Sequence, residues 1–183
     1  PYLIGQDLNS RPDQSPSRWV INFFDWDRDK AESYPGPFGI VKDRVLPERQ
    51  KIKHAGTRKK GTDFFWRYDS QAKELYQRIE SLQNVIAKSE VGNMLSFAML
   101  PNRGVFSHMV IVFASDAMGL LGLLQSTIHE TWARKYGSSM RTDLRYTPTS
   151  CFDTFPCPIS CQPLSDVAGN YHQIGRASCR ERV

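Results

Sequence analysis

The sequence predicts an α+β fold in which a small antiparallel β meander packs with helices and is followed by a long helix and an irregular C-terminal tail. Three observations support this prediction. Residues 84–114 alternate apolar runs with short turn sequences, as consecutive antiparallel strands do. Residues 115–137 repeat apolar side chains at helical spacing. Residues 138–163 contain four prolines and no sustained period, which indicates irregular chain on the surface.

Length and composition are those of a globular protein. The 183 residues allow one domain with a proper core, or one domain and an appendage. Apolar residues make up 40% of the chain and charged residues 23%, which argues against wholesale disorder. No apolar run approaches the roughly 20 residues that cross a bilayer, and no signal-type start is present. We therefore expect a cytoplasmic protein without a membrane partner.

The N-terminal part predicts short elements joined by turns. Residues 19–24 are β-branched and aromatic, which favours a well-covered strand. Asp25 can cap a short helix at residues 27–33. Residues 38–52 place apolar side chains near helical spacing, with a kink or break expected at Pro47.

The middle of the chain predicts the meander. Residues 53–62 hold almost nothing apolar and are expected to form an exposed loop. Residues 70–82 have the apolar spacing of a helix. Strand signals follow at residues 84–88, 95–100 and 106–114, and the simplest arrangement is three strands in sequence order, crossed by the next helix.

That long helix is expected to run from Ser115, whose hydroxyl can cap it, to Gly137, which supplies a left-handed stop. One apolar stripe along it must be buried, formed by Ala117, Leu120, Leu121, Leu124, Ile128 and Trp132. Phe152 and Phe155 are expected to anchor the irregular tail that follows. The closely spaced cysteines of this tail, Cys151, Cys157 and Cys161, are odd in number and fit reduced thiols.

Positive charge gathers between Lys42 and Arg67, where nine Lys and Arg residues stand against three Asp and Glu. With Trp66 and Tyr68 beside it, such a segment is typical of surfaces that neutralise nucleic-acid phosphates. A loop that only keeps the protein soluble explains the composition equally well.

The turn after the first meander strand, residues 88–93, carries side chains that can recognise base edges. Lysine donates to guanine, glutamate accepts from cytosine and asparagine pairs with adenine. Lys88, Glu90 and Asn93 are therefore candidate base contacts, although polar turns of this kind are more often simple connections. We call residues 88–93 the recognition turn.

No catalytic pattern or metal site is complete in the sequence. Asp25, Asp27 and Asp29 alternate as in a calcium loop, but Lys30 and Gly36 occupy the positions that need glycine and glutamate. The cysteine spacing is not that of a zinc site. There is no glycine-rich nucleotide loop and no Asn/Asp-Pro-Pro-aromatic tetrapeptide. We assign no catalytic or metal-ligating residue, and whether the chain is an enzyme stays open.

Two stretches carry a family resemblance: an opening with Asp7-Leu8-Asn9 and Arg18-Trp19, and the closing HETWARKYG and LRYTPTSCFDTFP within residues 129–156. With the segments between them, nearly all of residues 1–158 resembles the target-recognition and C-terminal regions of MmeI-like, type IIL restriction-modification DNA methyltransferases. Enzymes of this family methylate adenine at N6. Cys157 departs from the pattern, because an aromatic residue is usual there.

The resemblance implies a fragment of a longer methyltransferase, and the start at Pro1 without methionine fits that expectation. Residues 1–113 would be the C-terminal part of a target-recognition domain, and residues 114–172 a C-terminal helix and tail. Residues 173–183 resemble a translated sequencing adapter and are expected not to be native. An upstream methyltransferase domain of the same chain would bind S-adenosylmethionine, and no cofactor is expected in this fragment.

The resemblance also assigns roles on double-stranded DNA. Base contacts would come from Lys88, Glu90 and Asn93. Sequence-independent contacts to the phosphate backbone would come from Lys51, Lys53, Arg58, Lys59, Lys60 and Arg67. Packing and docking roles are expected for Trp132, Arg145, Tyr146 and Phe155.

Two other functions stay open. An RNA-binding module would use stacking aromatics such as Trp66 and Tyr68, and a non-catalytic protein-interaction scaffold would not bind nucleic acid in a salt-dependent way. The DNA interpretation requires the basic segment and the recognition turn to share a face. Lys59 and Glu90 are therefore expected on the same side of the protein.

Overall fold

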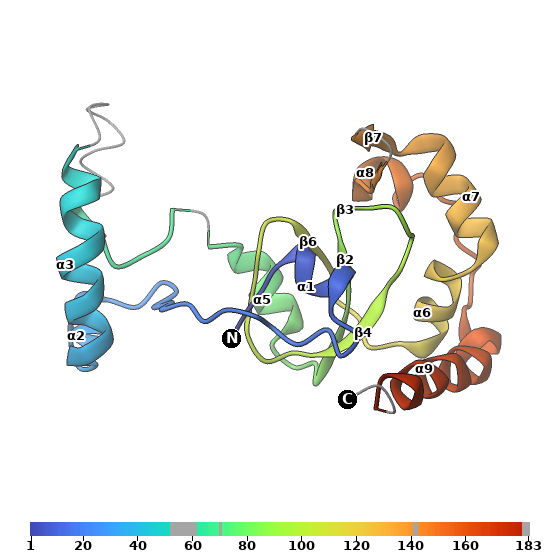
Figure 1. The fold of residues 1–183 in the computed structure, drawn as a ribbon, viewed down its shortest axis with the longest axis horizontal. Helices are drawn as coiled ribbons and strands as arrows, with labels where there is room; N and C mark the ends of the chain where they lie inside the picture. Colours follow the sequence, from blue (N-terminus) through green and yellow to red (C-terminus); the bar gives the residue numbers. More distant parts are fainter. Residues whose placement is uncertain (52–61, 70, 141–142, 181–183) are drawn as a thin grey trace. The chain divides into compact units, whose positions relative to one another are not determined.

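The computed structural model describes residues 1–51, 62–69, 71–140 and 143–180 (Figure 1). The chain forms two compact units, of which unit 1 contains Pro1–Trp19 with Gln77–Val183 and unit 2 contains Val20–Tyr76. The predicted mixed α+β class with small antiparallel sheets is confirmed. The functional boundaries after residues 113 and 172 stay predictions.

Unit 1 is built around an antiparallel sheet whose central strand is β2 (Asn84–Ser89). β4 (Ala98–Pro101) pairs with one edge of β2, and β6 (Val110–Phe113) pairs with the other. The strands lie where the sequence predicts them, but the meander order is wrong, because a meander would place β4 in the middle. β2 is buried from its second residue to its last, as a strand covered on both sides should be.

A second small sheet follows directly from the first. β2 continues through Glu90 into β3 (Val91–Gly92), which pairs with β8 (Asp143–Arg145), and β8 pairs with β7 (Ser138–Met140). The sequence predicted irregular chain over β7 and β8, and this is wrong. Strands of three residues are too short to show a period, and their partner β3 lies far away in the sequence.

The predicted long helix is two helices, α6 (Met118–Leu124) and α7 (Thr127–Tyr136). Among the described residues the longest helix is instead α3, with 17 residues. The break occurs because Ser126 caps α7, accepting a hydrogen bond from the His129 N–H at 3.2 Å. Gln125 turns away to exchange two hydrogen bonds with the backbone of Phe97, at 2.9 and 3.2 Å.

The break changes which side of α7 is buried. Ile128 was expected in the apolar stripe, but it is 73% exposed. His129 and Ala133 face the core in its place. Because the two helices are not coaxial continuations of one another, the stripe of α6 does not extend along α7.

Gly137 ends α7 with an extended backbone, at φ −72° and ψ 165°, so the predicted left-handed stop is wrong. Glycine fits here because of space. A Cβ atom would lie 2.5 Å from the Ala133 carbonyl oxygen and 2.9 Å from Leu144 Cδ1. The residue therefore lets α7 turn closely over the second sheet.

The rest of the predicted tail is also partly regular. It contains α8 (Pro148–Cys151), a 3-10 turn η1 (Gln162–Leu164) and α9 (Ser165–Arg180). α9 lies beside α6 (Figure 1), where a Cβ on Gly122 would come 3.0 Å from the Cβ of Ala168. The predicted anchors are confirmed. Phe155 is buried, and the ring of Phe152 packs on Phe113 with centroids 5.0 Å apart.

The N-terminal segment of unit 1 covers the central strand. β1 (Tyr2–Leu3) pairs in parallel with β5 (Val105–Phe106), and α1 (Gly5–Ser10) packs on β2. The Asn9 side chain donates to the Val91 carbonyl oxygen at 2.9 Å, which supports β3 from this side.

Unit 2 has an aromatic core covered by α2 (Arg28–Glu32) and α3 (Pro35–Lys51). Its buried residues are Phe23, Ala31, Phe38, Val41, Phe65 and Trp66. The strand predicted at residues 19–24 is absent from this described segment. Phe23 packs in the aromatic core, whereas Trp19 is 83% exposed.

Three further details of unit 2 differ from expectation or refine it. Asp27, and not Asp25, caps α2, by accepting from the Lys30 N–H at 2.8 Å. Pro47 lies inside α3, which continues through it. The helix predicted at residues 70–82 is shorter, α5 (Lys73–Ile79), and it crosses the division between the units.

Candidate nucleic-acid interface

The recognition turn is organised around Glu90, the single residue between β2 and β3. Its N–H donates to the Met109 carbonyl oxygen at 2.8 Å, and its own carbonyl accepts from the Tyr146 N–H at 2.8 Å. Its carboxylate accepts from Arg145 Nε at 2.6 Å. The main chain therefore holds Glu90 from both sides, at the junction of the two three-stranded sheets of unit 1.

Arg145 comes from β8 and presents its side chain partly to solvent. It is 47% exposed, whereas the Glu90 side chain is 16% exposed. Arg145 was expected to have a packing and docking role, but its guanidinium is ion-paired at the surface. The alternation of buried Leu144, exposed Arg145 and buried Tyr146 is the period-two signal that could have shown this from the sequence.

Lys88 points into the protein. It is 1% exposed, and its ammonium donates to the Ser89 carbonyl oxygen at 2.9 Å. The nitrogen lies 5.9 Å from the ring centre of Phe97 and 5.6 Å from that of Tyr146, an arrangement we call the aromatic cage. Burial lowers the pKa of Lys88 to about 8. A contact between this lysine and a base therefore requires its side chain to leave the cage.

Asn93 lies at the exposed end of the recognition turn. Its carbonyl oxygen accepts a hydrogen bond from Arg134 Nη2 at 3.2 Å, and Arg134 is itself paired with Glu130 at 2.7 Å. Both charged residues belong to α7. The sequence analysis did not assign a role to Arg134. The one sequence signal for it was its position in the last turn of a helix, where a cation is favourable.

A buried polar pair lies beneath the recognition turn. His129 Nε2 and the Tyr146 hydroxyl are 3.0 Å apart, and both residues are 0% exposed. Desolvation lowers the pKa of His129 to about 4 and raises the pKa of Tyr146, so both side chains are neutral at pH 7. His129 Nδ1 has no hydrogen-bond partner in the described structure.

The basic segment is described only at its ends. Four of its Lys and Arg residues lie outside the described part of the chain: Lys53, Arg58, Lys59 and Lys60. The expectation that Lys59 and Glu90 share one side of the protein therefore stays a prediction. Lys51 ends α3 and pairs with Glu48 at 2.6 Å.

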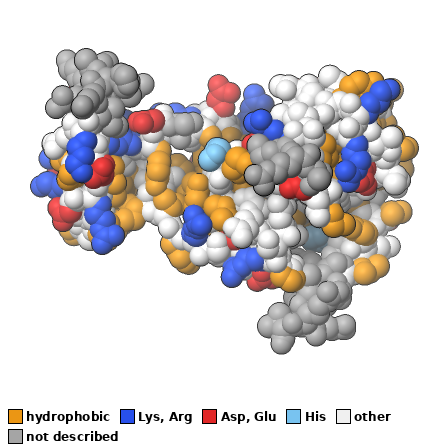
Figure 2. Space-filling view, turned by 45° about the horizontal axis from the view of Figure 1, so that its top comes forward, with side chains coloured by type: hydrophobic (Ala, Val, Ile, Leu, Met, Phe, Trp, Pro, Cys, Tyr) orange, Lys and Arg blue, Asp and Glu red, His pale blue; other side chains and the backbone are white. Residues whose placement is uncertain are grey.

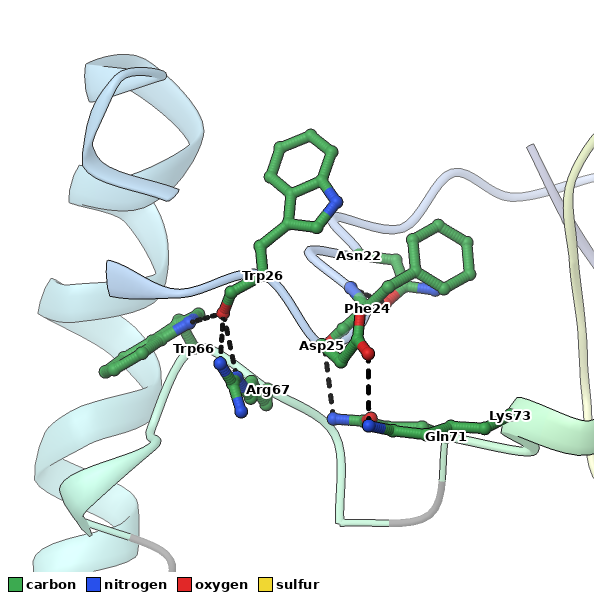
Figure 3. A network of polar contacts seen from close by, with 8 residues as sticks. All are labelled: Asn22, Phe24, Asp25, Trp26, Trp66, Arg67, Gln71 and Lys73. Atoms are coloured by element: carbon green, nitrogen blue, oxygen red, sulfur yellow. Dashed lines mark hydrogen bonds and ion pairs between the residues drawn. The ribbon is translucent and has the colours of Figure 1, made fainter. Parts of the chain in front are cut away.

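Arg67 holds unit 2 together. Its Nε and Nη2 donate to the Trp26 carbonyl oxygen at 2.8 and 2.6 Å, and Trp66 Nε1 donates to the same oxygen at 3.0 Å (Figure 3). Gln71 and Lys73 fasten the neighbouring segment by bonds to the Phe24 carbonyl oxygen and the Asp25 carboxylate. A phosphate contact by Arg67 would therefore add to a structural role.

The charged side chains drawn in Figure 2 are mixed in sign. On the face drawn there, Lys and Arg side chains lie among acidic and hydrophobic ones. Within the described ranges, no three His, Cys, Asp or Glu side chains are grouped to hold a metal ion. No helix in the described part of the chain has the length and apolar character needed to cross a bilayer.

Comparison with known proteins gives three findings. The target recognition domain family of MmeI matches residues 13–159. DNA methyltransferase A of Bacillus subtilis (strain 168) is 35% identical over 54 residues, which cover 30% of this chain and 6% of that protein. The fold resembles the structure of the type IIL restriction-modification enzyme MmeI in complex with DNA, with a TM-score of 0.70 and 18% identity. That match covers 91% of this chain and 22% of the MmeI chain.

This chain thus spans a small part of the length of the proteins it matches. The family match extends from the loop before unit 2, through the recognition turn and the two three-stranded sheets of unit 1, to the end of the segment anchored by Phe155. The chain belongs to the MmeI target recognition domain family.

Proposed function

We propose that this chain binds double-stranded DNA and selects the sequence that an adenine-N6 DNA methyltransferase modifies. The upstream methyltransferase domain of the same polypeptide would bind S-adenosylmethionine and carry out methyl transfer to a flipped adenine. Family membership supports this proposal, and the fold it shares with MmeI is that of an enzyme whose structure contains DNA.

The observation that carries the proposal is the geometry of Glu90. The backbone of Glu90 is fixed by two main-chain hydrogen bonds and its carboxylate is bonded by Arg145, and a carboxylate placed in this way can accept from a cytosine amino group in the major groove. Arg145, which is partly exposed, can donate from its other nitrogens to guanine. Asn93 at the exposed end of the turn can pair with adenine, and Lys88 joins them when it leaves the aromatic cage.

Phosphate contacts complete the proposed mechanism. The residues assigned to them are Lys51, Lys53, Arg58, Lys59, Lys60 and Arg67. Such contacts set the affinity and the register of the protein on DNA without reading its sequence. Because they release counterions, binding should weaken steeply as salt is raised.

Duplex binding at several salt concentrations tests the proposal. The triple variant Arg58→Gln, Lys59→Gln, Lys60→Gln should bind all duplexes more weakly and show a smaller salt dependence. Its matched control is Arg28→Gln, which removes a cation paired with Glu32 at the start of α2. Binding to duplex DNA that is absent, or independent of salt, would favour a protein-interaction scaffold and overturn the proposal.

Competition with single-stranded RNA separates the remaining alternative. An RNA-binding module would stack bases on Trp66 and Tyr68. Trp66 is buried and its indole N–H is bonded to Trp26, so this structure offers only one of the two rings at the surface. We expect RNA to displace duplex DNA poorly, and efficient displacement would favour the RNA-binding function.

A further inference from the structure

Helix α7 contacts the recognition turn directly at one end of β3, and through Tyr146 at the other end. At one end, Arg134 donates to the Asn93 carbonyl oxygen at 3.2 Å. At the other end, His129 bonds the Tyr146 hydroxyl at 3.0 Å, and the Tyr146 N–H donates to the Glu90 carbonyl oxygen at 2.8 Å. The two-residue strand β3 therefore lies between a direct contact from Arg134 and a main-chain contact from Tyr146, whose side chain is bonded to the same helix.

Tyr146 connects three residues that the proposed function uses. Its main chain holds Glu90, its ring forms one side of the cage around Lys88, and it follows Arg145 directly in the chain. A tilt of this ring would change the cage around Lys88, and a shift of the whole residue would also displace the main chain that bonds Glu90. The orientation of Tyr146 therefore affects the groups proposed to meet the bases.

The hydroxyl of Tyr146 is the point at which that orientation is set. The ring is surrounded by apolar and aromatic groups, with Phe97 packed edge-on at 5.5 Å between centroids. These contacts fill space but tolerate small rotations, whereas a hydrogen bond to the imidazole fixes a direction. Phe155 in turn packs edge-on against His129 at 4.6 Å and limits the movement of that ring.

A core built only for stability would not need this pair. An apolar side chain of similar size would bury as much surface, and it would avoid leaving His129 Nδ1 without a partner. Buried polar pairs that lower stability in this way can persist where they specify one arrangement of the chain. Here the arrangement specified is that of the recognition turn.

We propose that His129 and Tyr146 are positioning residues that fix the direction of the Glu90 and Arg145 side chains and so set the base preference of the protein. This inference rests on the proposed function. Neither residue is proposed to touch a base. Both are buried, and both act only through the residues that they hold in place.

Selection from a pool of random duplexes, followed by sequencing of the retained molecules, tests the inference on the complete chain. Tyr146→Phe and His129→Leu remove the hydrogen bond, whereas His129→Gln can keep it because the Gln amide nitrogen lies near the position of Nε2. In the first two variants, we expect the preference for the selected base over the others to fall about tenfold at the base pairs nearest the turn. His129→Gln should retain it, and so should the control Tyr171→Phe, which changes an exposed tyrosine of α9.

A purely structural role would give a different pattern. It would lower the fraction of folded protein in Tyr146→Phe and His129→Leu, but the folded molecules would retain duplexes with the wild-type base preference, and this result would overturn the inference. If Tyr146→Phe does not fold, the comparison of His129→Leu with His129→Gln decides alone. A wild-type chain without any base preference would instead overturn the proposed function itself.

Discussion

The Glu90 carboxylate accepts a hydrogen bond from Arg145 Nε at 2.6 Å, and 55 residues of sequence separate the two. The pair joins the junction between β2 and β3 to β8, the central strand of the second sheet. Because the backbone of Glu90 is bonded on both sides, the carboxylate has little freedom to follow its partner. The arginine is the more exposed and the more adaptable of the two.

A double-mutant cycle should show that this pair is coupled. Glu90→Gln and Arg145→Gln should each lower the free energy of unfolding by up to about 1 kcal/mol, and together by less than the sum, because the pair is partly shielded from solvent. Urea unfolding of the four proteins measures this. The pair Arg28 and Glu32, at 62% and 43% exposed, is the control and should show weaker coupling. Equal coupling in the two pairs would contradict the shielding argument.

Acid should destabilise the protein through His129. The folded-state pKa of about 4 lies below the ordinary 6.5, so between these values the unfolded chain binds a proton that the folded chain does not. The contribution of His129 to the free energy of unfolding is therefore fully present above pH 6.5 and is lost as the pH falls towards 4. Between pH 7 and pH 4.5, we expect the wild type to lose about 2 kcal/mol of unfolding free energy through His129. The His129→Gln variant should not show this loss. Identical pH profiles for the two proteins would show that His129 is not the group responsible.

Arg67→Lys should destabilise unit 2 although it keeps the positive charge. Lysine cannot reproduce the two guanidinium bonds to the Trp26 carbonyl oxygen, and their loss should cost about 1–2 kcal/mol of unfolding free energy. Thermal unfolding measures this, with Lys51→Gln at the exposed end of α3 as the control. A variant as stable as the wild type would indicate that Trp66 alone holds this carbonyl.

Gly137→Ala should destabilise unit 1 through a steric clash. The added Cβ would lie 2.5 Å from the Ala133 carbonyl oxygen, and relieving this contact should cost about 1–3 kcal/mol. Gly39→Ala in α3 is the matched control, because a Cβ there meets nothing within 4 Å. The control should gain up to about 1 kcal/mol from its better helix propensity. Equal effects at both positions in urea unfolding would contradict the close approach of α7.

The sequence predicted those features that depend on residues close to one another along the chain. The strand β2, its neighbours and the anchoring of Phe152 and Phe155 follow from apolar runs and spacing, and the resemblance was carried by motifs at both ends of the matched region. The break between α6 and α7 did not follow, because Gln125 is bound by the backbone of Phe97 from another strand. Helical periodicity continues across this break in the sequence, so only the tertiary contact reveals it.

The candidate site shows the same division. Lys88, Glu90 and Asn93 were assigned from their residue types in an expected hairpin turn, but Lys88 lies in β2 and only Glu90 separates β2 from β3. Their assignment to base contacts stays a prediction. The burial of Lys88 could not be found in this way, because the rings of the aromatic cage come from Phe97 and Tyr146, which are separate in the sequence and meet only in the folded chain. The ion pair of Arg145 with Glu90 could not be found either, since the two residues are 55 positions apart in the sequence.

The most direct test of the central claim is to sequence the duplexes that the wild-type chain and Glu90→Gln retain from one random pool. We expect the wild type to select a defined motif. Glu90→Gln should change the preference at one base pair, and its binding should depend on salt as that of the wild type does. Glu32→Gln, which removes an exposed carboxylate from unit 2, should leave the motif unchanged. Identical motifs for the wild type and Glu90→Gln would contradict the assignment of the recognition turn to base recognition.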